Sequence, residues 1–440
     1  MNTEEIYKIF LQYPQIITDS KKIKKNSIFW ALKGKNFDGS NFIKNALNSG
    51  AEFAVTDNPE YKKSKKVITV TNSLKALQEL ALYHRRQIKV PILAITGTNG
   101  KTTTKELINS VLSSQYKISA TKGNLNNHIG VPLTLLSINK SDNAGIIEMG
   151  ANHPGEIEQL CKIAEPDFGL ITNIGKAHLE GFGSFEGVIK AKSELYEYLT
   201  KNNGTIFFNK DNKILSSLNK GKKQIAYGTS NDVYLKGKII NADPFLKIEA
   251  ETYEGLKIEI NTKLTGDYNF ENILAAACVG DFFNISIQNI KKAVENYIPV
   301  NNRSQIIKTE YNTIILDAYN ANPASMTASI NSFVKSHKGK KIIISGDMYE
   351  LGKYSKEEHH KIIMLLKNIL NGNNSVKKAI ITGKYFKEAY TDNIKQSEIL
   401  HFNTTKELET FLQKESYKNY TFLIKGSRAV KLENIVNSIP

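Results

Sequence analysis

The sequence predicts an α/β protein of three domains in which parallel sheets are covered by helices. The chain has 440 residues, and at about 100–200 residues per domain this length corresponds to two to four domains. Short apolar runs alternate with segments of helical periodicity, as in parallel sheets that are buried on both faces. A glycine-rich loop near residue 100 stands between one such run and a helix.

Residues 1–86 are predicted to form a small α/β domain. Short runs of apolar and β-branched residues indicate strands, and leucines at helical spacing after Ser73 indicate a helix. The predicted strands are 27–32, 51–55 and 67–70, and the predicted helices are 42–49 and the segment that begins at Ser73.

Residues 87–298 are predicted to form a central P-loop domain with a parallel sheet. Its strands are expected at 92–95, 145–148, 168–172 and 205–208, with helices between them. The segment 224–265 alternates apolar and polar residues and is expected to form an antiparallel appendage. A helix that begins near Asn269 completes the domain.

Residues 299–440 are predicted to form a carboxy-terminal Rossmann-like domain. Four apolar runs, each separated from the next by a helical segment, indicate a second doubly wound sheet. These runs are 313–316, 341–344, 379–381 and 421–424.

The net charge of +16 raises the question of nucleic-acid binding. Only four of the 59 basic residues are arginines, and the lysines are scattered along the chain. Arginine is the residue suited to bidentate recognition of phosphate, so the charge indicates a compositional bias and no nucleic-acid partner. The acidic amino terminus predicts no signal peptide, and no run approaches the ~18 apolar residues of a membrane span. We expect a cytoplasmic monomer.

The glycine-rich loop predicts a phosphate site. It reads Gly97-Thr98-Asn99-Gly100-Lys101-Thr102-Thr103. In such a loop the backbone N–H groups and the helix N-terminus face phosphate groups. Lys101 would bridge the outer phosphates of ATP, and the Thr102 hydroxyl would bind Mg²⁺. The loop is shorter than the general P-loop pattern, and a plain turn between strand and helix is the alternative.

The string at 96–103, Thr-Gly-Thr-Asn-Gly-Lys-Thr-Thr, resembles the ATP loop of the Mur ligase family. Members of this family have three domains, activate a carboxylate as an acyl phosphate and let an amine attack it. The resemblance implies an ATP-dependent ligase that uses ATP and two Mg²⁺ ions. The first domain would then bind a UDP-linked substrate, and the third domain would bind an incoming dipeptide.

Glu148 and His178 are the expected metal ligands besides Thr102. Glu148 ends a predicted parallel strand, where a side chain faces the ligand crevice, and its carboxylate suits Mg²⁺. A solvent-exposed glutamate at a strand end is the alternative. The resemblance makes His178 a ligand of the second ion through a neutral imidazole nitrogen.

Lys192 is the fourth expected catalytic residue, with Lys101, Glu148 and His178. The composition of the segment around Lys192, taken alone, suggests the solvent-exposed face of a helix. The Ala-Lys-x-x-Leu pattern around it resembles the site of a carbamylated lysine in Mur ligases, where the modified side chain lies beside Mg²⁺. Lys190 is a competing candidate.

Asn269 and Asn272 are expected to contact adenine. Their spacing of three places both amides on one helix face, and an amide can donate and accept at the same base edge. A simple N-cap by Asn269 is the alternative. The resemblance further implies that Arg303 contacts phosphate and that Asp317 contacts the ribose.

Three strings narrow the resemblance to ligases that join D-alanyl-D-alanine to UDP-N-acetylmuramoyl-tripeptide. They are Gly-Asn-Leu-Asn-Asn-His-Ile-Gly-Val-Pro-Leu-Thr at 123–134, Asp-Ala-Tyr-Asn-Ala-Asn-Pro at 317–323 and Gly-Asp-Met-Tyr-Glu-Leu-Gly at 346–352. Lys21 departs from the arginine that the family often carries there, which weakens the uridine-diphosphate site in the first domain. The expected substrate contacts are Ser27, Asn124, Asn126, Asn127, Tyr319, Asn320, Asn322, Asp347 and Arg428.

Other interpretations stay open. The ligase that adds the third amino acid would carry an Asp-Asn-Pro-Arg string, which this chain lacks. A folylpolyglutamate synthase would lack the first domain. A non-catalytic nucleotide-binding switch would not need Glu148, His178 and a lysine around a metal.

Overall fold

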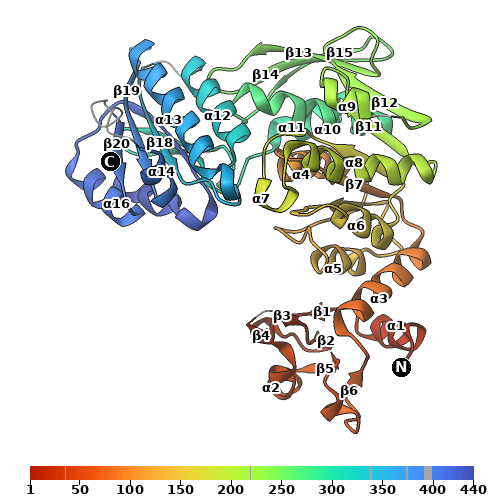
Figure 1. Cartoon of the computed structure of the whole chain (residues 1–440). Coiled ribbons are helices and arrows are strands. Elements are labelled where there is room, and N and C mark those ends of the chain that lie inside the picture. Colours follow the sequence, from red (N-terminus) through yellow and green to blue (C-terminus); the bar gives the residue numbers. More distant parts are fainter. Residues whose placement is uncertain (35, 219, 301, 337–338, 373–374, 391–398) are drawn as a thin grey trace.

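The computed structural model contains three large sheets that follow one another along the chain (Figure 1). The first domain also has a small antiparallel sheet of β3 (Lys33–Gly34) and β4 (Phe37–Asp38). It describes all residues except 35, 219, 301, 337–338, 373–374 and 391–398. The first and third domains are both attached to the central domain, so ligand contacts can come from two sides (Figure 1).

The first domain has a four-stranded parallel sheet of order β1-β2-β5-β6. All three predicted strands are confirmed. The strands are β1 (Ile16–Ile17), β2 (Ser27–Trp30), β5 (Ala51–Thr56) and β6 (Val67–Thr69), and the helices are α1 (Thr3–Gln12), α2 (Ile43–Asn48) and α3 (Ser73–Ile88). Helix α1 was not predicted, although Asn2 and Glu5 form a capping box at its start.

Helix α3 joins the first domain to the second through two of the four arginines. Arg85 Nη2 donates to Asp167 Oδ2 at 2.8 Å, and Arg85 Nε donates to the Ala164 carbonyl at 2.9 Å. Arg86 pairs with the Glu165 carboxylate. These two arginines therefore hold domains together and are not available to bind phosphate groups.

The central domain has a nine-stranded sheet of order β15-β14-β13-β12-β11-β10-β7-β9-β8. The strands predicted at 92–95, 145–148, 168–172 and 205–208 are confirmed, whereas β8 was not predicted. The strands are β7 (Ile92–Thr96), β8 (Ile118–Ala120), β9 (Ala144–Glu148), β10 (Phe168–Ile171), β11 (Thr205–Asn209), β12 (Lys223–Gly228), β13 (Leu235–Asn241), β14 (Lys247–Thr252) and β15 (Lys257–Asn261).

The antiparallel appendage expected at 224–265 is confirmed for its last three strands, whereas its first strand, β12, is parallel to its neighbours. Its strands extend the central sheet, and β12 pairs in parallel with both β11 and β13. Only the pairs β13–β14 and β14–β15 are antiparallel. Alternation of apolar and polar residues marks a strand but does not specify the direction of its neighbour.

Helices cover both faces of the central sheet (Figure 1). They are α4 (Lys101–Leu112), α5 (Gly130–Ser137), α6 (Glu156–Ala164), α7 (Leu179–Phe182), α8 (Phe185–Lys201), α9 (Lys213–Leu218), α10 (Phe270–Phe282) and α11 (Ile287–Asn296). Strands β10, β7 and β9 are adjacent and parallel, so the loops after their carboxyl ends meet at one edge of the sheet.

The third domain has a six-stranded sheet of order β16-β17-β21-β18-β19-β20, in which only the edge strand β16 is antiparallel. The four predicted strands are confirmed, and β16 and β20 were not predicted. The strands are β16 (Gln305–Lys308), β17 (Thr313–Asp317), β18 (Lys340–Gly346), β19 (Val376–Thr382), β20 (Ile399–Phe402) and β21 (Tyr420–Lys425), and the longer helices are α12 (Pro323–Lys335), α13 (Ser355–Gly372), α14 (Lys384–Ala389) and α16 (Thr405–Lys414).

None of the helices in the described parts of the chain combines the length and apolar character that a membrane crossing requires.

Candidate active site

One large cleft lies between the central and third domains, with a volume of about 870 Å³. This volume falls within the range of small-molecule sites. Most of the predicted site residues line it together. They are Thr98, Asn99, Gly100, Lys101, Thr102, Thr103, Asn124, Asn126, Asn127, Glu148, His178, Asn269, Asn272, Arg303, Asp317, Tyr319, Asn320 and Arg428.

The glycine loop is held in shape by the residues that follow β10. Thr98 N–H donates to the Asn173 carbonyl, and Asn99 N–H donates to Asn173 Oδ1, both at 2.9 Å. Asn173 Nδ2 and Thr172 Oγ1 both donate to the Asn99 carbonyl. Gly97 packs so closely on Thr172 that a Cβ would come within 2.1 Å of its hydroxyl, and its φ of +140° favours glycine.

Helix α4 begins directly after this loop and presents its N-terminus to the cleft. Its N-cap is Gly100, which has a φ of +77° and makes no side-chain cap. A Cβ at Gly100 would lie 2.4 Å from Asn272 Oδ1. The first-turn N–H groups and the helix dipole thus favour an anion here.

Lys101 lies at the start of α4, with Nζ donating to the carbonyls of Gly97 at 2.8 Å and Thr98 at 3.0 Å. Burial lowers the pKa of Lys101, and the Glu148 carboxylate opposes this shift. A phosphate group in the loop would accept hydrogen bonds from Nζ in place of these carbonyls.

Glu148, Thr102 and Asn126 form an oxygen-rich group at the base of the cleft. Thr102 Oγ1 donates to Glu148 Oε2 at 2.9 Å, and Asn126 Nδ2 donates to Glu148 Oε1 at 2.8 Å. Glu148 is buried. Among the residues that the structure describes, no three His, Cys, Asp or Glu side chains gather as a metal cage. One carboxylate and one hydroxyl fit Mg²⁺, because this ion usually takes its other ligands from phosphate and water.

His178 begins α7 in a left-handed conformation, with a φ of +50°. Its Nδ1 contacts Oε2 of Glu350, which belongs to the third domain. Hydrogen bonding to His178 lowers the pKa of the Glu350 carboxyl. The predicted metal ligand His178 is thus bound to a residue across the domain boundary.

Lys192 and Lys190 lie in α8 in different environments. Lys192 is buried, whereas Lys190 is exposed. Burial and the neighbouring Lys101 lower the pKa of Lys192 to about 7. Of the two lysines, only Lys192 has the buried, less basic amine, and it does not line the cleft surface itself.

Asn269 and Asn272 are buried and hydrogen-bonded to each other, which their spacing of three allows. Asn272 Nδ2 donates to Asn269 Oδ1 at 2.8 Å, and Asn269 Nδ2 donates to the Thr265 carbonyl. Asn269 makes no side-chain cap for α10, so the capping alternative does not hold. Thr104 Oγ1 donates to Asn272 Oδ1 and ties the pair to α4.

Two arginines of the third domain share one aromatic ring. The Arg303 guanidinium lies 3.7 Å from the Tyr319 ring centroid, and that of Arg428 lies 5.6 Å from it. All three side chains line the cleft. Stacking on the ring orients planar guanidinium groups for anion binding.

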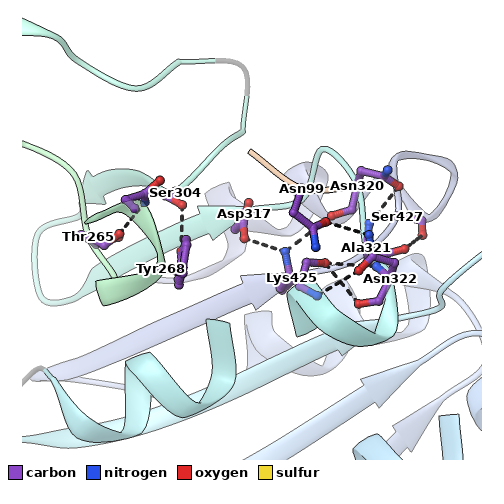
Figure 2. A network of polar contacts seen from close by, with 12 residues as sticks. Asn99, Thr265, Tyr268, Ser304, Asp317, Asn320, Ala321, Asn322, Lys425 and Ser427 are labelled. Carbon is purple, nitrogen blue, oxygen red and sulfur yellow. Dashed lines mark hydrogen bonds and ion pairs between the residues drawn. The ribbon is translucent and has the colours of Figure 1, made fainter. Parts of the chain in front are cut away.

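Asp317 forms an ion pair with Lys425 at the end of β17 (Figure 2). Lys425 Nζ lies 2.6 Å from Asp317 Oδ2, and the Lys425 side chain is only 3% exposed. Lys425 also donates to the Asn320 carbonyl. Lys425 therefore fixes the carboxylate that was predicted to contact ribose.

The third domain also contacts the phosphate loop directly. Asn322 Nδ2 donates to Asn99 Oδ1 at 2.8 Å, as Figure 2 shows. Asn322 also forms the capping box of α12, and it lies beside the cleft surface, not on it. Tyr268 of the central domain and Ser304 of the third domain share a further hydrogen bond of 2.9 Å (Figure 2).

The side chains of Asp347 and Ser27 are buried away from the cleft, and their expected substrate contacts stay predictions. Asp347 is buried and accepts hydrogen bonds from the backbone N–H groups of Tyr385 and Phe386 at the start of α14. Ser27 is fully buried in β2, and its hydroxyl donates to the Lys24 carbonyl. Neither side chain lines the cleft.

Four residues of the site were not singled out from the sequence. Glu350 lies inside the string 346–352, in which only Asp347 was a predicted contact. Lys425 lies three positions before Arg428, and Asn173 lies five positions before His178. Tyr268 precedes Asn269 directly. Their position immediately after strands or beside predicted contacts was the available signal.

Comparison with known families assigns each domain. The middle domain of Mur ligases matches residues 95–280, the Mur ligase glutamate ligase domain matches residues 302–428, and the catalytic domain of the Mur ligase family matches residues 12–93.

Individual relatives match over nearly the whole chain. UDP-N-acetylmuramoyl-tripeptide–D-alanyl-D-alanine ligase of Bacillus subtilis is 31% identical over 100% of this chain and 97% of the relative. The enzyme of the same name from Buchnera aphidicola of Baizongia pistaciae is 37% identical, over 96% and 92%. The crystal structure of MurF from Acinetobacter baumannii shares the fold with a TM-score of 0.87 and 28% sequence identity, over 100% of this chain and 98% of that chain. The crystal structure of the MurF ligase from Thermotoga maritima in complex with ADP shares it with a TM-score of 0.84 and 26% identity, over 97% of each chain.

Proposed function

Because this chain belongs to the Mur ligase family, we propose that its cleft joins D-alanyl-D-alanine to UDP-N-acetylmuramoyl-tripeptide at the expense of ATP. It is an ATP-dependent ligase of peptidoglycan synthesis. One observation carries the assignment of the cleft: the phosphate loop of the central domain and the stacked arginines of the third domain line the same 870 Å³ space.

Residues of the central domain and of the third domain, on opposite sides of the cleft, both take part in the reaction. ATP lies on the loop 97–102, with adenine toward Asn269 and Asn272 and ribose toward Asp317. The tripeptide carboxylate attacks the γ-phosphorus and displaces ADP, which gives an acyl phosphate. The amine of D-alanyl-D-alanine then attacks the acyl carbon, loses a proton and expels phosphate. Lys101 stabilises the negative charge on the transferred group.

Thr102 and Glu148 are the residues that would hold the Mg²⁺ ion of the nucleotide. His178 and a carbamylated Lys192 would serve a second ion. When bound, Mg²⁺ neutralises charge on the phosphate oxygens during transfer. Asn126 donates to Glu148, so it keeps the carboxylate oriented toward the loop.

The contacts between the domains serve the acyl phosphate. Water would hydrolyse this intermediate and waste ATP, so the cleft must exclude water during the reaction. Asn322 on Asn99 and Glu350 on His178 close the cleft at two points. We also propose that the protein acts as a monomer in the cytoplasm, because residues of one chain line the cleft and the proposed substrates are nucleotides. We also propose domain boundaries at 86/87 and 298/299.

Phosphate release from ATP by the purified chain, measured against a panel of peptides, tests the function. UDP-N-acetylmuramoyl-tripeptide with D-alanyl-D-alanine should release phosphate and give the pentapeptide by mass spectrometry. Release with UDP-N-acetylmuramoyl-dipeptide and a single diamino acid would instead identify the ligase of the preceding step. Nucleotide binding without release under any condition would favour the nucleotide-binding switch.

A further inference from the structure

The segment 346–352 carries Glu350, a third-domain residue that contacts His178 of the central domain. Its Gly-Asp-Met-Tyr-Glu-Leu-Gly string was read from the sequence as a substrate loop through Asp347. The structure assigns Asp347 to the start of α14, which leaves the purpose of the loop unexplained by substrate contact.

The loop is fixed from behind by the third domain. Met348 N–H donates to His359 Nε2 at 3.0 Å, and His359 Nδ1 donates to the Ser355 carbonyl at 2.7 Å. Tyr349 N–H donates to Ser427 Oγ at 3.3 Å. The Met348 side chain is fully buried. The loop is thus a rigid support, and Glu350 extends from it with a φ of +64°.

Glu350 meets the segment that contains His178. The Glu350 carboxylate contacts His178 Nδ1, and the Glu350 carbonyl accepts a hydrogen bond of 3.3 Å from Glu180 N–H. Gly352 packs on Glu180, where a Cβ would lie 3.1 Å from the Glu180 Cβ. The contact between the two loops therefore involves backbone as well as side-chain atoms and does not depend on the Glu350 side chain alone. In Figure 1, α7 lies on the side of the central domain that faces the third domain.

Two further contacts surround this pair. Lys176 Nζ lies 3.4 Å from Glu358 Oε1, and Tyr354 Oη donates to the Gly183 carbonyl at 3.3 Å. Both join the same two segments, 176–183 and 350–358. The interface therefore fixes the position of Glu350 relative to the His178 ring.

The contact with Glu350 determines which nitrogen of the His178 imidazole carries the proton. A carboxylate at Nδ1 keeps the proton on that nitrogen, so the lone pair of neutral histidine lies on Nε2. Histidines that bind metals commonly donate their other N–H to a carboxylate, which sets the tautomer and the ring orientation. His178 lines the cleft beside the nucleotide site.

We propose that Glu350 is a positioning residue that sets the tautomer and orientation of His178, so that docking of the third domain completes the metal site of the central domain. This inference rests on the proposed nucleotide and Mg²⁺ site. It assigns the loop 346–352 to communication between domains and not to substrate binding.

Mn²⁺ binding in the presence of the β,γ-imido analogue of ATP tests the proposal on the full chain without peptide substrates. Free Mn²⁺ is measured by electron paramagnetic resonance. Glu350→Ala should raise the apparent Mn²⁺ dissociation constant by about 10-fold, as for other supporting residues of metal sites. Glu350→Gln, which keeps an acceptor oxygen, should recover part of this loss. Glu357→Gln, a charge change at an exposed site of the neighbouring α13, should bind like wild type.

A double-mutant cycle separates positioning from a merely structural role. If Glu350 acts through His178, adding Glu350→Ala to His178→Ala should change the dissociation constant by less than about 2-fold. An undiminished effect of Glu350→Ala in that background, or wild-type Mn²⁺ affinity of the single variant, would overturn the proposal. Unchanged thermal unfolding of both variants confirms that they fold. If the wild-type protein released no phosphate with D-alanyl-D-alanine, the proposed function would be refuted. The double-mutant cycle would still be interpretable, because it measures Mn²⁺ binding and not turnover.

Discussion

Thr102 and Glu148, which come from a helix start and a strand end, share a hydrogen bond of 2.9 Å at the base of the cleft. The bond joins α4 to β9 and places an acidic group where the nucleotide phosphates are expected. A buried carboxylate is costly unless it is paired or binds a metal. The hydroxyl and the Asn126 amide satisfy Glu148 and keep it ready to bind a cation.

Replacement of Glu148 should therefore impair metal use more than folding. We expect Glu148→Gln to lower kcat by at least about 100-fold, because a ligand to the phosphate-bound ion contributes several kcal/mol to charge stabilisation. Phosphate release measured across a Mg²⁺ titration checks this. The exposed Glu158→Gln on α6 is the control. Wild-type Mg²⁺ dependence in Glu148→Gln would contradict the assignment.

Lys101 should be required for phosphoryl transfer. Its Nζ bonds to loop carbonyls, so its removal leaves the loop without a cation for the outer phosphates. We expect Lys101→Ala to abolish ATP-dependent phosphate release, while Lys213→Ala, at an exposed site on α9, retains it. Normal turnover by Lys101→Ala would rule out the proposed role.

Tyr319 should act through the two arginines that stack on it. Each cation–π contact contributes about 0.5–2 kcal/mol, and 1.4 kcal/mol corresponds to tenfold in affinity. Tyr319→Leu should then raise KM for ATP or the UDP substrate by about 10-fold, whereas Tyr319→Phe, which keeps the ring, should stay within about 2-fold. Equal losses in both variants would instead indicate a role for the hydroxyl.

Much of this site could be predicted because the strands of a parallel sheet appear in the sequence as apolar runs. The residues that bind ligands follow the carboxyl ends of these runs. Glu148 was identified by its place at the end of such a strand and His178 by the family resemblance, and the cleft contains both. Strand direction was less predictable, since β12 pairs in parallel although the strands that follow it in the same segment pair antiparallel. The direction of β12 relative to its neighbours depends on which strands pair with its two edges, here β11 and β13.

Contacts between distant parts of the chain could not be predicted. Lys425 and Asp317 are 108 positions apart, and no spacing rule relates them. A family string also does not say which of its residues faces the ligand: Asp347 supports a helix, whereas Glu350 of the same string reaches the cleft.

Asp347 should matter for stability before it matters for substrate affinity. Its carboxylate accepts from two backbone N–H groups, that of Phe386 buried and that of Tyr385 partly buried, and each unsatisfied buried donor costs about 1–3 kcal/mol. We expect Asp347→Ala to lower the free energy of unfolding by about 2–4 kcal/mol in urea denaturation. A raised KM for D-alanyl-D-alanine with unchanged unfolding would restore the substrate role.

Lys192 should take up CO₂ in a pH-dependent way. Burial and Lys101 lower the pKa of Lys192 to about 7, so the amine is mostly neutral above pH 7 and protonated below it. Only the neutral amine attacks CO₂ to form a carbamate and release a proton. The lowered pKa also means that, between about pH 7 and 10, the unfolded chain binds more protons than the native chain. The unmodified protein therefore gains stability as pH rises through this window.

Incubation with ¹³C-bicarbonate should give a carbamate signal in the ¹³C NMR spectrum at pH 8 that is much weaker at pH 6. Lys192→Arg should lose the signal, and Lys190→Arg, two positions away on the exposed face of α8, should keep it. The matched pair distinguishes the buried lysine from the exposed one that the sequence could not exclude. A signal retained in Lys192→Arg and lost in Lys190→Arg would reverse the assignment, and the second metal ligand would then have to come from another residue.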